Sequence, residues 1–268
     1  MQREFQFYIV PTPIGNMSDI TLRAIEVLKE VDIIACEDTR TTQNILNHYN
    51  IHTKTISYHK YNEKSMVTDI LSKLEAGKKI ALVSDAGTPM ICDPGSVLLK
   101  ELKDNHIKVT SLPGACAVST FLSQIPRDNE EFTFVGFFPK TKKLATNLIL
   151  DYKKINLIFY ESPNRILDTL DFIKSIRGNI TVAIGRELSK LYEEVLVDDI
   201  ESILKHFEEG IKGEIVCMLY SSTEKETSDV TDKINKLKNK GFKSKEISTI
   251  LSALYDYNKN EIYKLSLN

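Results

Sequence analysis

The sequence has 268 residues, enough for roughly two domains of about 150 residues with cores of their own, which excludes small disulfide-stabilised folds and fibrous proteins. Apolar residues make up 42% and charged residues 27% of the chain, values that are ordinary for a globular protein and exclude a largely disordered one. The formal net charge of -2 gives no overall basic surplus for nucleic-acid binding, although a local basic patch could still provide it.

The N-terminal segment and the cysteines indicate the compartment. The first 15 residues contain only a short apolar run interrupted by two prolines, which is too short for a signal peptide or a membrane span. Cys36, Cys92, Cys116 and Cys217 form no pair at zinc-ligand spacing, so no metal site is expected. We expect a cytoplasmic, reducing location, with the cysteines as buried small hydrophobic residues.

Apolar strand-like runs alternate with amphipathic helical stretches through most of the chain, which predicts an α/β fold. The predicted strands cover residues 5–10, 32–35, 79–84, 107–112, 132–137, 156–161, 180–185 and 214–219. The predicted helices, with apolar residues three and four positions apart, cover 22–31, 65–77, 166–176 and 200–210. Glycines that follow the helical repeats mark helix ends at Gly77, Gly178 and Gly210.

Two polar segments, 125–131 and 221–229, interrupt this alternation. They predict three parts: an N-terminal α/β lobe over 1–124, a second α/β lobe over 125–222, and a small C-terminal helical appendix over 223–268.

The carboxyl ends of strands are where open α/β sheets bind ligands. Four predicted strand ends carry prolines, glycines, acids or small residues, at 11–16, 37–40, 84–89 and 112–117. A rigid turn, a helix cap or close packing would also explain three of them. The segment 84–89, followed by the Asp93-Pro94-Gly95 turn, is better explained by a loop shaped around a ligand.

Several common catalytic motifs are absent from the sequence. There is no G-x-G-x-x-G and no G-x-x-x-x-G-K-[ST], so neither a dinucleotide fingerprint nor a Walker loop is present. Neither HExxH nor G-x-S-x-G occurs, and the five histidines are scattered. Zinc hydrolases and serine hydrolases are therefore disfavoured.

Nine blocks in a fixed order resemble the ribosomal RNA small subunit methyltransferase I family of the tetrapyrrole methylase superfamily. They are VPTPIGN (10–16), DITLRA (19–24), ACEDTR (35–40), ALVSDAGTP (81–89), DPG (93–95), LPGAC (112–116), IFYESPNRI (158–166), RELSKLYEE (186–194) and GEIV (213–216). The resemblance implies two α/β lobes with S-adenosylmethionine in the cleft between them, a homodimer, and 2′-O-methylation of a cytidine ribose in the decoding region of 16S rRNA. The substrate would be the small ribosomal subunit or its free 16S rRNA.

The same resemblance implies which residues contact the cofactor. Carried over by motif, they are Pro13, Ile14, Asp85, Ala86, Gly87, Thr88, Ile91, Cys116, Ala117, Tyr160, Glu161 and Leu188.

A 2′-hydroxyl is a weak nucleophile, so a group that accepts its proton during attack would help by about a hundredfold or more. We expect Asp38 or His59 to act nearest the ribose, with Arg40 gripping a phosphate or holding the carboxylate. Other acidic candidates are Glu63, Asp85 and Glu161.

Two lysine clusters could contact phosphates despite the near-neutral charge. Such clusters are also common as solvated surface. The lysines are Lys140, Lys142 and Lys143 in one cluster and Lys236, Lys238, Lys240, Lys243 and Lys245 in the other.

The sequence departs from the family pattern at three places. Tyr61 stands where the family often has a second histidine, Ala115 replaces a usual proline, and the stretch 123–126 is about two residues short. Two other functions stay open: carbon methylation of a tetrapyrrole, and a ribosome-assembly factor without catalysis. The EDTR and SDAGTP blocks and the C-terminal lysines disfavour the first, and the intact cofactor loops disfavour the second.

Overall fold

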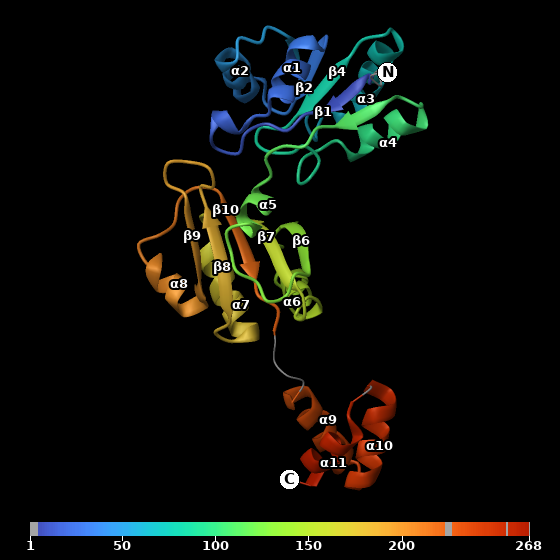
Figure 1. Cartoon of the computed structure of the whole chain (residues 1–268), viewed down its shortest axis with the longest axis vertical. Coiled ribbons are helices and arrows are strands. Elements are labelled where there is room, and N and C mark those ends of the chain that lie inside the picture. Colours follow the sequence, from blue (N-terminus) through green and yellow to red (C-terminus); the bar gives the residue numbers. More distant parts are fainter. Residues whose placement is uncertain (1–4, 223–226, 256, 268) are drawn as a thin grey trace. The chain divides into compact units, whose positions relative to one another are not determined.

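The computed structural model describes residues 5–222, 227–255 and 257–267. The chain divides into two compact units, Met1–Ser221 and Ser222–Asn268, and each is described by itself. The first unit contains two five-stranded sheets, which we call the first and the second lobe (Figure 1).

The sheet of the first lobe has the order β3-β2-β4-β1-β5, with every neighbouring pair parallel. Its strands are β1 (Phe7–Ile9), β2 (Ile33–Cys36), β3 (Lys54–Ser57), β4 (Ile80–Val83) and β5 (Val109–Ser111). The helices of this lobe are α1 (Leu22–Glu30), α2 (Thr39–His48), α3 (Glu63–Glu75) and α4 (Ser96–Asp104), with a short 3-10 helix at Met17–Asp19.

Both faces of this sheet are buried, because successive side chains of its apolar strands point to opposite sides. In β2, Ile33 packs into the core that also holds Leu74 of α3, whereas Ile34 packs into the core that holds Leu28 of α1. Helices α3 and α4 therefore cover one face, and α1 and α2 the other. Because all the strands are parallel, their carboxyl ends lie together at one edge of the sheet, which is where open α/β sheets bind ligands.

The second lobe has a mixed sheet of order β6-β7-β10-β8-β9, in which only the β6–β7 pair is parallel. Its strands are β6 (Phe132–Phe137), β7 (Asn156–Glu161), β8 (Thr181–Arg186), β9 (Glu194–Asp199) and β10 (Ile215–Leu219). Its helices are α5 (Ala117–Leu122), α6 (Lys142–Asp151), α7 (Ile166–Arg177) and α8 (Ile200–His206).

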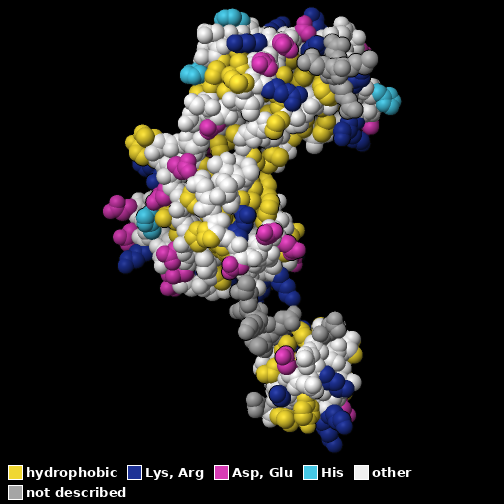
Figure 2. All heavy atoms as spheres, viewed as in Figure 1, with side chains coloured by type: hydrophobic (Ala, Val, Ile, Leu, Met, Phe, Trp, Pro, Cys, Tyr) yellow, Lys and Arg dark blue, Asp and Glu magenta, His cyan; other side chains and the backbone are white. Residues whose placement is uncertain are grey.

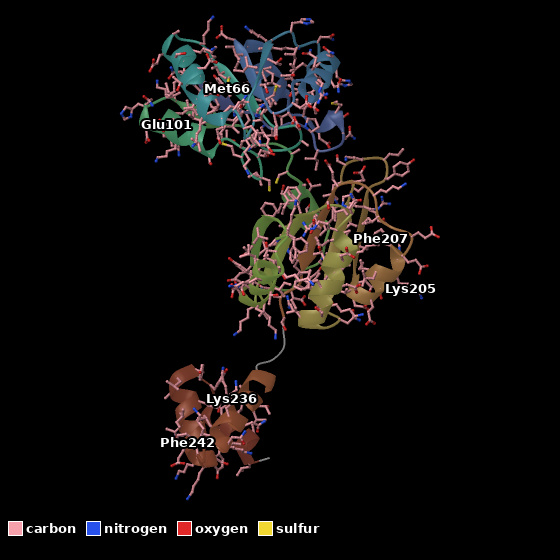
Figure 3. All side chains as sticks on the ribbon, turned by 180° about the vertical axis from the view of Figure 1, so that it is seen from behind. Met66, Glu101, Lys205, Phe207, Lys236 and Phe242 are labelled. Carbon is pink, nitrogen blue, oxygen red and sulfur yellow. The ribbon has the colours of Figure 1, made fainter. Side chains whose placement is uncertain are left out.

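Helices α6, α7 and α8 cover one face of the second sheet, with Phe207, just after α8, packed into the same core (Figure 3). The other face is covered by α5, whose Phe121 is fully buried. A Cβ at Gly185 of β8 would lie 2.7 Å from the Phe121 ring. Glycine at this position therefore lets α5 lie directly on the sheet.

The C-terminal unit consists of α9 (Thr227–Asn239), α10 (Ser244–Tyr255) and α11 (Lys259–Leu267). Val230, Ile234, Ile247, Leu251 and Ile262 form its buried core. The unit thus has a small hydrophobic core of its own.

The predicted α/β class and the C-terminal helices are confirmed by these elements. Strands β3 and β9, both at sheet edges, were not predicted. Strand β3 has exposed polar residues at both ends, and the short apolar run of β9, residues 195–197, is only partly buried and is flanked by acids. The helix predicted to end at Gly210 ends earlier, at His206. The boundaries 1–124, 125–222 and 223–268 stay a prediction.

Candidate active site

A cavity of about 450 Å³ opens between the loops of the two lobes, in the part of the molecule where hydrophobic side chains gather between the sheets (Figure 2). Its walls come from the segments after β1, β2, β4 and β8, from the ends of β6 and β7 and the turn after β7, and from the starts of α5 and β10. The lining residues are Ile14, Glu37, Asp85–Thr88, Ile91–Asp93, Cys116, Ala117, Phe137, Tyr160–Pro163, Leu188 and Gly213–Val216. A volume in the range of about 300–1,000 Å³ is typical of sites for small molecules and cofactors.

The loop after β4 is fixed to the loop after β1. The backbone of Thr12 exchanges two hydrogen bonds with that of Gly87, at 2.9 and 3.0 Å, and the Thr12 hydroxyl donates to the Ser84 carbonyl at 3.0 Å. Gly87 has a φ of +77°, and a Cβ there would lie 3.2 Å from Cγ2 of Ile14. Only glycine adopts this conformation without strain, so backbone rather than side chains faces the cavity here.

Further contacts fix the β4 loop to the segment before α5 and hold the end of β7 in place. The Thr88 hydroxyl donates a hydrogen bond of 2.9 Å to the Ala115 carbonyl, next to the start of α5. Glu161, almost fully buried, accepts a hydrogen bond of 3.0 Å from the Thr169 hydroxyl and pairs with Arg165 at 3.2 Å. Glu161 is therefore a fixed structural carboxylate at the base of the wall. Burial raises the pKa of the Tyr160 phenol beside it.

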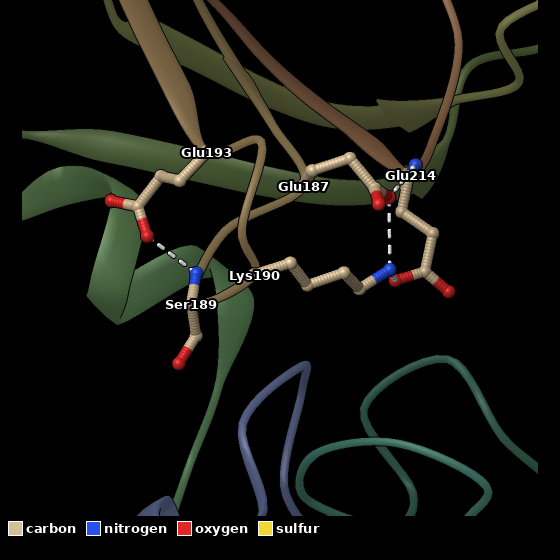
Figure 4. Close-up of polar contacts among 5 residues, drawn as sticks. All are labelled: Glu187, Ser189, Lys190, Glu193 and Glu214. Carbon is tan, nitrogen blue, oxygen red and sulfur yellow. Dashed lines mark hydrogen bonds and ion pairs between the residues drawn. The ribbon is translucent and has the colours of Figure 1, made fainter.

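The loop between β8 and β9 frames the cavity through Leu188. Glu187 and Ser189, on either side of it, have positive φ values of 50° and 67°. The Lys190 ammonium donates hydrogen bonds to Glu187 at 2.8 Å and to Glu214 at 3.0 Å, and the Ser189 backbone N–H donates to Glu193 (Figure 4). These contacts stabilise a left-handed backbone conformation that costs non-glycine residues free energy.

The side chain of Lys190 also contacts the first lobe. A Cβ at Gly15 would lie 2.4 Å from Cγ of Lys190 and 2.8 Å from the Leu188 carbonyl oxygen. In addition, the Ser189 hydroxyl bonds the Asp19 carboxylate. The β8–β9 loop therefore joins the two lobes at one side of the cavity.

Carboxylates dominate the charge of the cavity. Five of the lining residues are acidic, Glu37, Asp85, Asp93, Glu161 and Glu214, and no lysine, arginine or histidine of the described residues lines it. Arg165 forms an ion pair with Glu161, and Lys190 forms one with Glu214. The first lobe thus contributes three acids without a cationic partner in the cavity, which favours a positively charged ligand.

Asp93 is the acid whose titration is most altered. Burial, followed by the charges of Glu37 and Asp85, raises its pKa to about 6. A carboxyl with this pKa changes its charge close to neutral pH.

Eleven of the twelve residues expected to bind the cofactor line this one cavity; Pro13 is not among them. The structure therefore brings together segments from five different loops. Whether these residues contact a cofactor stays a prediction.

The three expected catalytic residues do not line the cavity. Asp38 begins α2, where its carboxylate accepts hydrogen bonds from the Arg40 backbone N–H and from the Arg40 guanidinium, both at 2.8 Å. These bonds lower the pKa of Asp38 to about 2. His59 is half-buried, and its Nδ1 accepts a hydrogen bond of 3.3 Å from the Asn62 backbone N–H. Asp38 nevertheless adjoins the cavity, because its own N–H donates to Asp85 at 3.1 Å.

The expected RNA-binding lysines lie on two surfaces. Lys140, Lys142 and Lys143 are exposed at the start of α6. In the C-terminal unit Lys236, Lys240, Lys243 and Lys245 are exposed and Lys238 is half-buried. Figure 2 shows basic side chains beside hydrophobic ones on this unit, and Figure 3 labels Lys236 and Phe242 on it.

Some residues of the cavity were missed from the sequence. Glu37 and Asp93 lie within blocks that the family resemblance had marked, and the turn of Asp93 had been noted for its shape alone. The others are Cys92, Phe137, Ser162, Pro163, Gly213, Glu214, Ile215 and Val216. The cysteines were expected to be buried, which is wrong for Cys92 and Cys116: Cys92 is exposed and Cys116 half-exposed, both at the cavity, while Cys36 and Cys217 are buried.

The described residues include no group of three or more His, Cys, Asp or Glu side chains placed to hold a metal ion. None of the helices in the described ranges has the length and hydropathy of a membrane span.

Comparisons with known proteins give a consistent result. Residues 6–204 match the family model of the tetrapyrrole (corrin/porphyrin) methylases. The chain is 42% identical over 266 residues to "Ribosomal RNA small subunit methyltransferase I" of Buchnera aphidicola, covering 96% of this chain and 94% of that protein. It is 37% identical over 270 residues to the protein of the same name from Escherichia coli O157:H7, covering 98% of this chain and 94% of the relative.

Solved structures show a similar fold. A crystal structure of diphthine synthase superposes with a TM-score of 0.66 at 13% identity, covering 80% of this chain and 89% of that chain. Uroporphyrin-III C-methyl transferase from Thermus thermophilus, complexed with S-adenyl homocysteine, has a TM-score of 0.56 at 15% identity and covers 80% of this chain and 96% of that one.

Proposed function

Because this chain belongs to the ribosomal RNA small subunit methyltransferase I family of the tetrapyrrole methylases, we propose that it transfers a methyl group from S-adenosylmethionine to the ribose 2′-oxygen of a cytidine in the decoding region of 16S rRNA. S-adenosylmethionine supplies the methyl group as an electrophile on a positively charged sulfur.

The observation that carries the proposal is the cavity between the lobes. Eleven residues expected to bind the cofactor converge on it, and its described lining holds five acids and no cationic side chain. This charge balance suits a ligand that carries a sulfonium and an ammonium group. The exposed backbone around Gly87 allows close approach of the cofactor, as the ligand-facing turns of other α/β folds do.

Catalysis would depend mainly on position, because methyl transfer needs the acceptor oxygen in line with the methyl carbon and its leaving sulfur. The contacts of Thr12, Thr88 and Lys190 fix the walls that would hold the cofactor in that alignment. Asp38, Arg40 and His59 would then lie nearest the RNA. In that arrangement Arg40, with a side chain that is 90% exposed, grips a phosphate while its bond to Asp38 keeps both residues in place.

The two lysine clusters would supply phosphate contacts away from the cavity, which add affinity without sequence specificity. We also propose that the chain is a homodimer in solution, in line with the family resemblance. Sedimentation equilibrium tests this directly, and a monomer at micromolar concentration would contradict it.

The acid-rich cavity also argues against carbon methylation of a tetrapyrrole. Such substrates carry several carboxylates, which the three cavity acids without a cationic partner, Glu37, Asp85 and Asp93, would repel. A 2′-hydroxyl is neutral and can enter the cavity while the phosphates on either side of it stay outside.

The test is methyl transfer to small ribosomal subunits that lack this modification. Purified protein is incubated with methyl-labelled S-adenosylmethionine and the particles, and the RNA is then hydrolysed in alkali. A labelled alkali-resistant dinucleotide containing cytidine is expected, because a 2′-O-methyl group blocks cleavage at that position. Label only in mononucleotides would indicate base methylation, and no transfer to particles or free rRNA would contradict the proposal.

The expected roles of Asp38 and His59 are tested in the same assay. Full single-turnover rates in both Asp38→Asn and His59→Ala would remove them from the mechanism.

A further inference from the structure

Asp93 lies in a tight turn between β4 and α4 and lines the cavity. The turn is held from behind by Glu63, whose Oε1 accepts hydrogen bonds from the Gly95 backbone N–H at 3.0 Å and from the Tyr58 hydroxyl at 2.7 Å. Gly95 has a φ of +137°, and a Cβ there would lie 2.7 Å from the Met90 side chain. The backbone at the end of the turn that carries Asp93 is therefore held in place by Glu63.

Of the other acids that line the cavity, all but Glu37 have a hydrogen-bond or ion-pair partner among the described residues. Glu161 is bonded to Thr169 and Arg165, and Glu214 to Lys190. The Asp85 carboxylate accepts a hydrogen bond from the Asp38 backbone N–H.

The two remaining acidic candidates for the proton acceptor, Glu63 and Asp38, have hydrogen-bond partners as well. Glu63 is engaged by the Asp93 turn, and Asp38 is bound by Arg40, which leaves its pKa at about 2. A carboxylate with so low a pKa is a weak proton acceptor at neutral pH.

Asp93 differs from these acids, because nothing among the described residues donates a hydrogen bond to its carboxylate and only burial and neighbouring acids act on it. Burial, followed by the charges of Glu37 and Asp85, raises its pKa to about 6, close to the value that suits a base working near neutral pH. No lysine, arginine or histidine of the described residues lines the cavity to counter this effect. The titratable groups that share a cavity wall with it are Glu37, Tyr58, Asp85, Cys92, Cys116, Tyr160, Glu161 and Glu214.

We propose that Asp93 is the general base of the methyl transfer. Its carboxylate takes the proton of the ribose 2′-hydroxyl while the 2′-oxygen bonds to the methyl carbon and the carbon–sulfur bond breaks, with the bonding pair left on sulfur. The proton then passes from Asp93 to solvent. This inference rests on the proposed function, since it names the residue that activates the acceptor oxygen.

The variant Asp93→Asn tests it, with Asp93→Glu as the conservative change and Asp104→Asn as the control. Asp104 is an exposed residue at the end of α4, so its change removes one negative charge from the same segment without touching the cavity. Three quantities are measured for each protein: the single-turnover rate at saturating particle and cofactor between pH 5 and 8, the Kd for S-adenosylmethionine by calorimetry, and the carboxyl titration by carbon-13 NMR.

We expect Asp93→Asn to lower the single-turnover rate at saturating cofactor about a hundredfold or more, a far larger effect than the rise in the Kd for the cofactor that follows from removing one of the cavity acids. The wild-type rate should fall tenfold per pH unit below about pH 6, and the variant should lose this limb. Asp93→Glu should recover part of the rate, and Asp104→Asn should behave as wild type.

Two results would overturn the role of Asp93. One is a variant that keeps the wild-type rate and pH profile. The other is a greatly raised Kd for the cofactor together with a wild-type rate at saturating cofactor, which would make Asp93 a cofactor-binding residue. Failure of the proposed function itself is distinct, because the wild-type protein would then give no alkali-resistant product while the NMR titration of Asp93 still reported its pKa.

Discussion

The backbone N–H of Asp38 donates a hydrogen bond of 3.1 Å to Oδ1 of Asp85. This bond ties the start of α2 to the loop that follows the neighbouring strand β4. It fixes the half-buried Asp38 and its exposed partner Arg40 beside the cavity wall.

We expect Arg40→Ala to weaken substrate binding more than chemistry. The side chain is 90% exposed and would contact phosphate rather than the reacting atoms. The KM for the ribosomal particle should rise about threefold to tenfold, because one phosphate contact is lost, whereas the single-turnover rate at saturating particle should stay within about threefold. A large fall in the saturating rate would instead show that Arg40 positions a group that reacts.

Gly87→Ala should impair both folding and cofactor binding. The positive φ of Gly87 costs an alanine about 1–2 kcal/mol, and the new Cβ would press on Ile14 at 3.2 Å. Gly77→Ala is a matched control, because Gly77 has a φ of +82° but nothing within 4 Å of its Cβ position. Urea unfolding should show a loss of stability in both variants, larger in Gly87→Ala because of the contact with Ile14, and calorimetry should show weaker S-adenosylmethionine binding in Gly87→Ala alone. Equal affinities in the two variants would mean that the Gly87 loop does not contact the cofactor.

The sequence predicted the parallel core of the first lobe well, because its strands are buried on both faces and are continuously apolar. Strands β2 and β4, for example, are buried along their whole length. The edge strand β3 could not be found in this way, since Lys54 and Ser57 at its ends are exposed and its apolar signal is limited to Ile56.

Within the site, motif resemblance predicted residues that present backbone or small side chains, such as Ala86 and Gly87. It did not predict Asp93, because the raised pKa of that residue arises from its burial in the folded chain and from the charges of Glu37 and Asp85. A carboxylate such as Glu63, chosen from sequence as a possible base, proved to be engaged in holding a turn.

Lys190→Met should loosen the β8–β9 loop that places Leu188 at the cavity. The change removes hydrogen bonds to Glu187 and Glu214 while keeping most of the aliphatic side chain. We expect the Kd for S-adenosylmethionine to rise about threefold to tenfold, which corresponds to about 1 kcal/mol. Lys73→Met, which breaks the ion pair with Asp69 on α3, is the control and should leave the Kd unchanged.

We also expect Lys190→Met to change how the free energy of unfolding depends on pH. Lys190 and the Glu214 backbone N–H lower the pKa of Glu187 below its usual 4.5. The stabilisation by this carboxylate is therefore fully present above the unfolded pKa and is lost as the pH falls through the lower folded pKa. The difference in unfolding free energy between wild type and Lys190→Met should be largest near pH 7 and shrink below about pH 4, as urea titrations at several pH values would show. A difference that does not change with pH would contradict the assignment.

Replacing the C-terminal lysines should flatten the salt dependence of RNA binding. Each phosphate contact that is lost lowers the slope of log K against log salt by about 0.7–0.9, so glutamine at all five positions should reduce it by about 1–4 while the full chain is kept. The five positions are Lys236, Lys238, Lys240, Lys243 and Lys245. The comparison variant replaces Lys140, Lys142 and Lys143, which lie at the start of α6, and shows how much of the slope arises in the first unit. Fluorescence anisotropy with a labelled decoding-region RNA measures both. If the five-lysine variant kept the wild-type slope, the lysines of the C-terminal unit would be ordinary solvated surface, and RNA binding would not be the role of its helices.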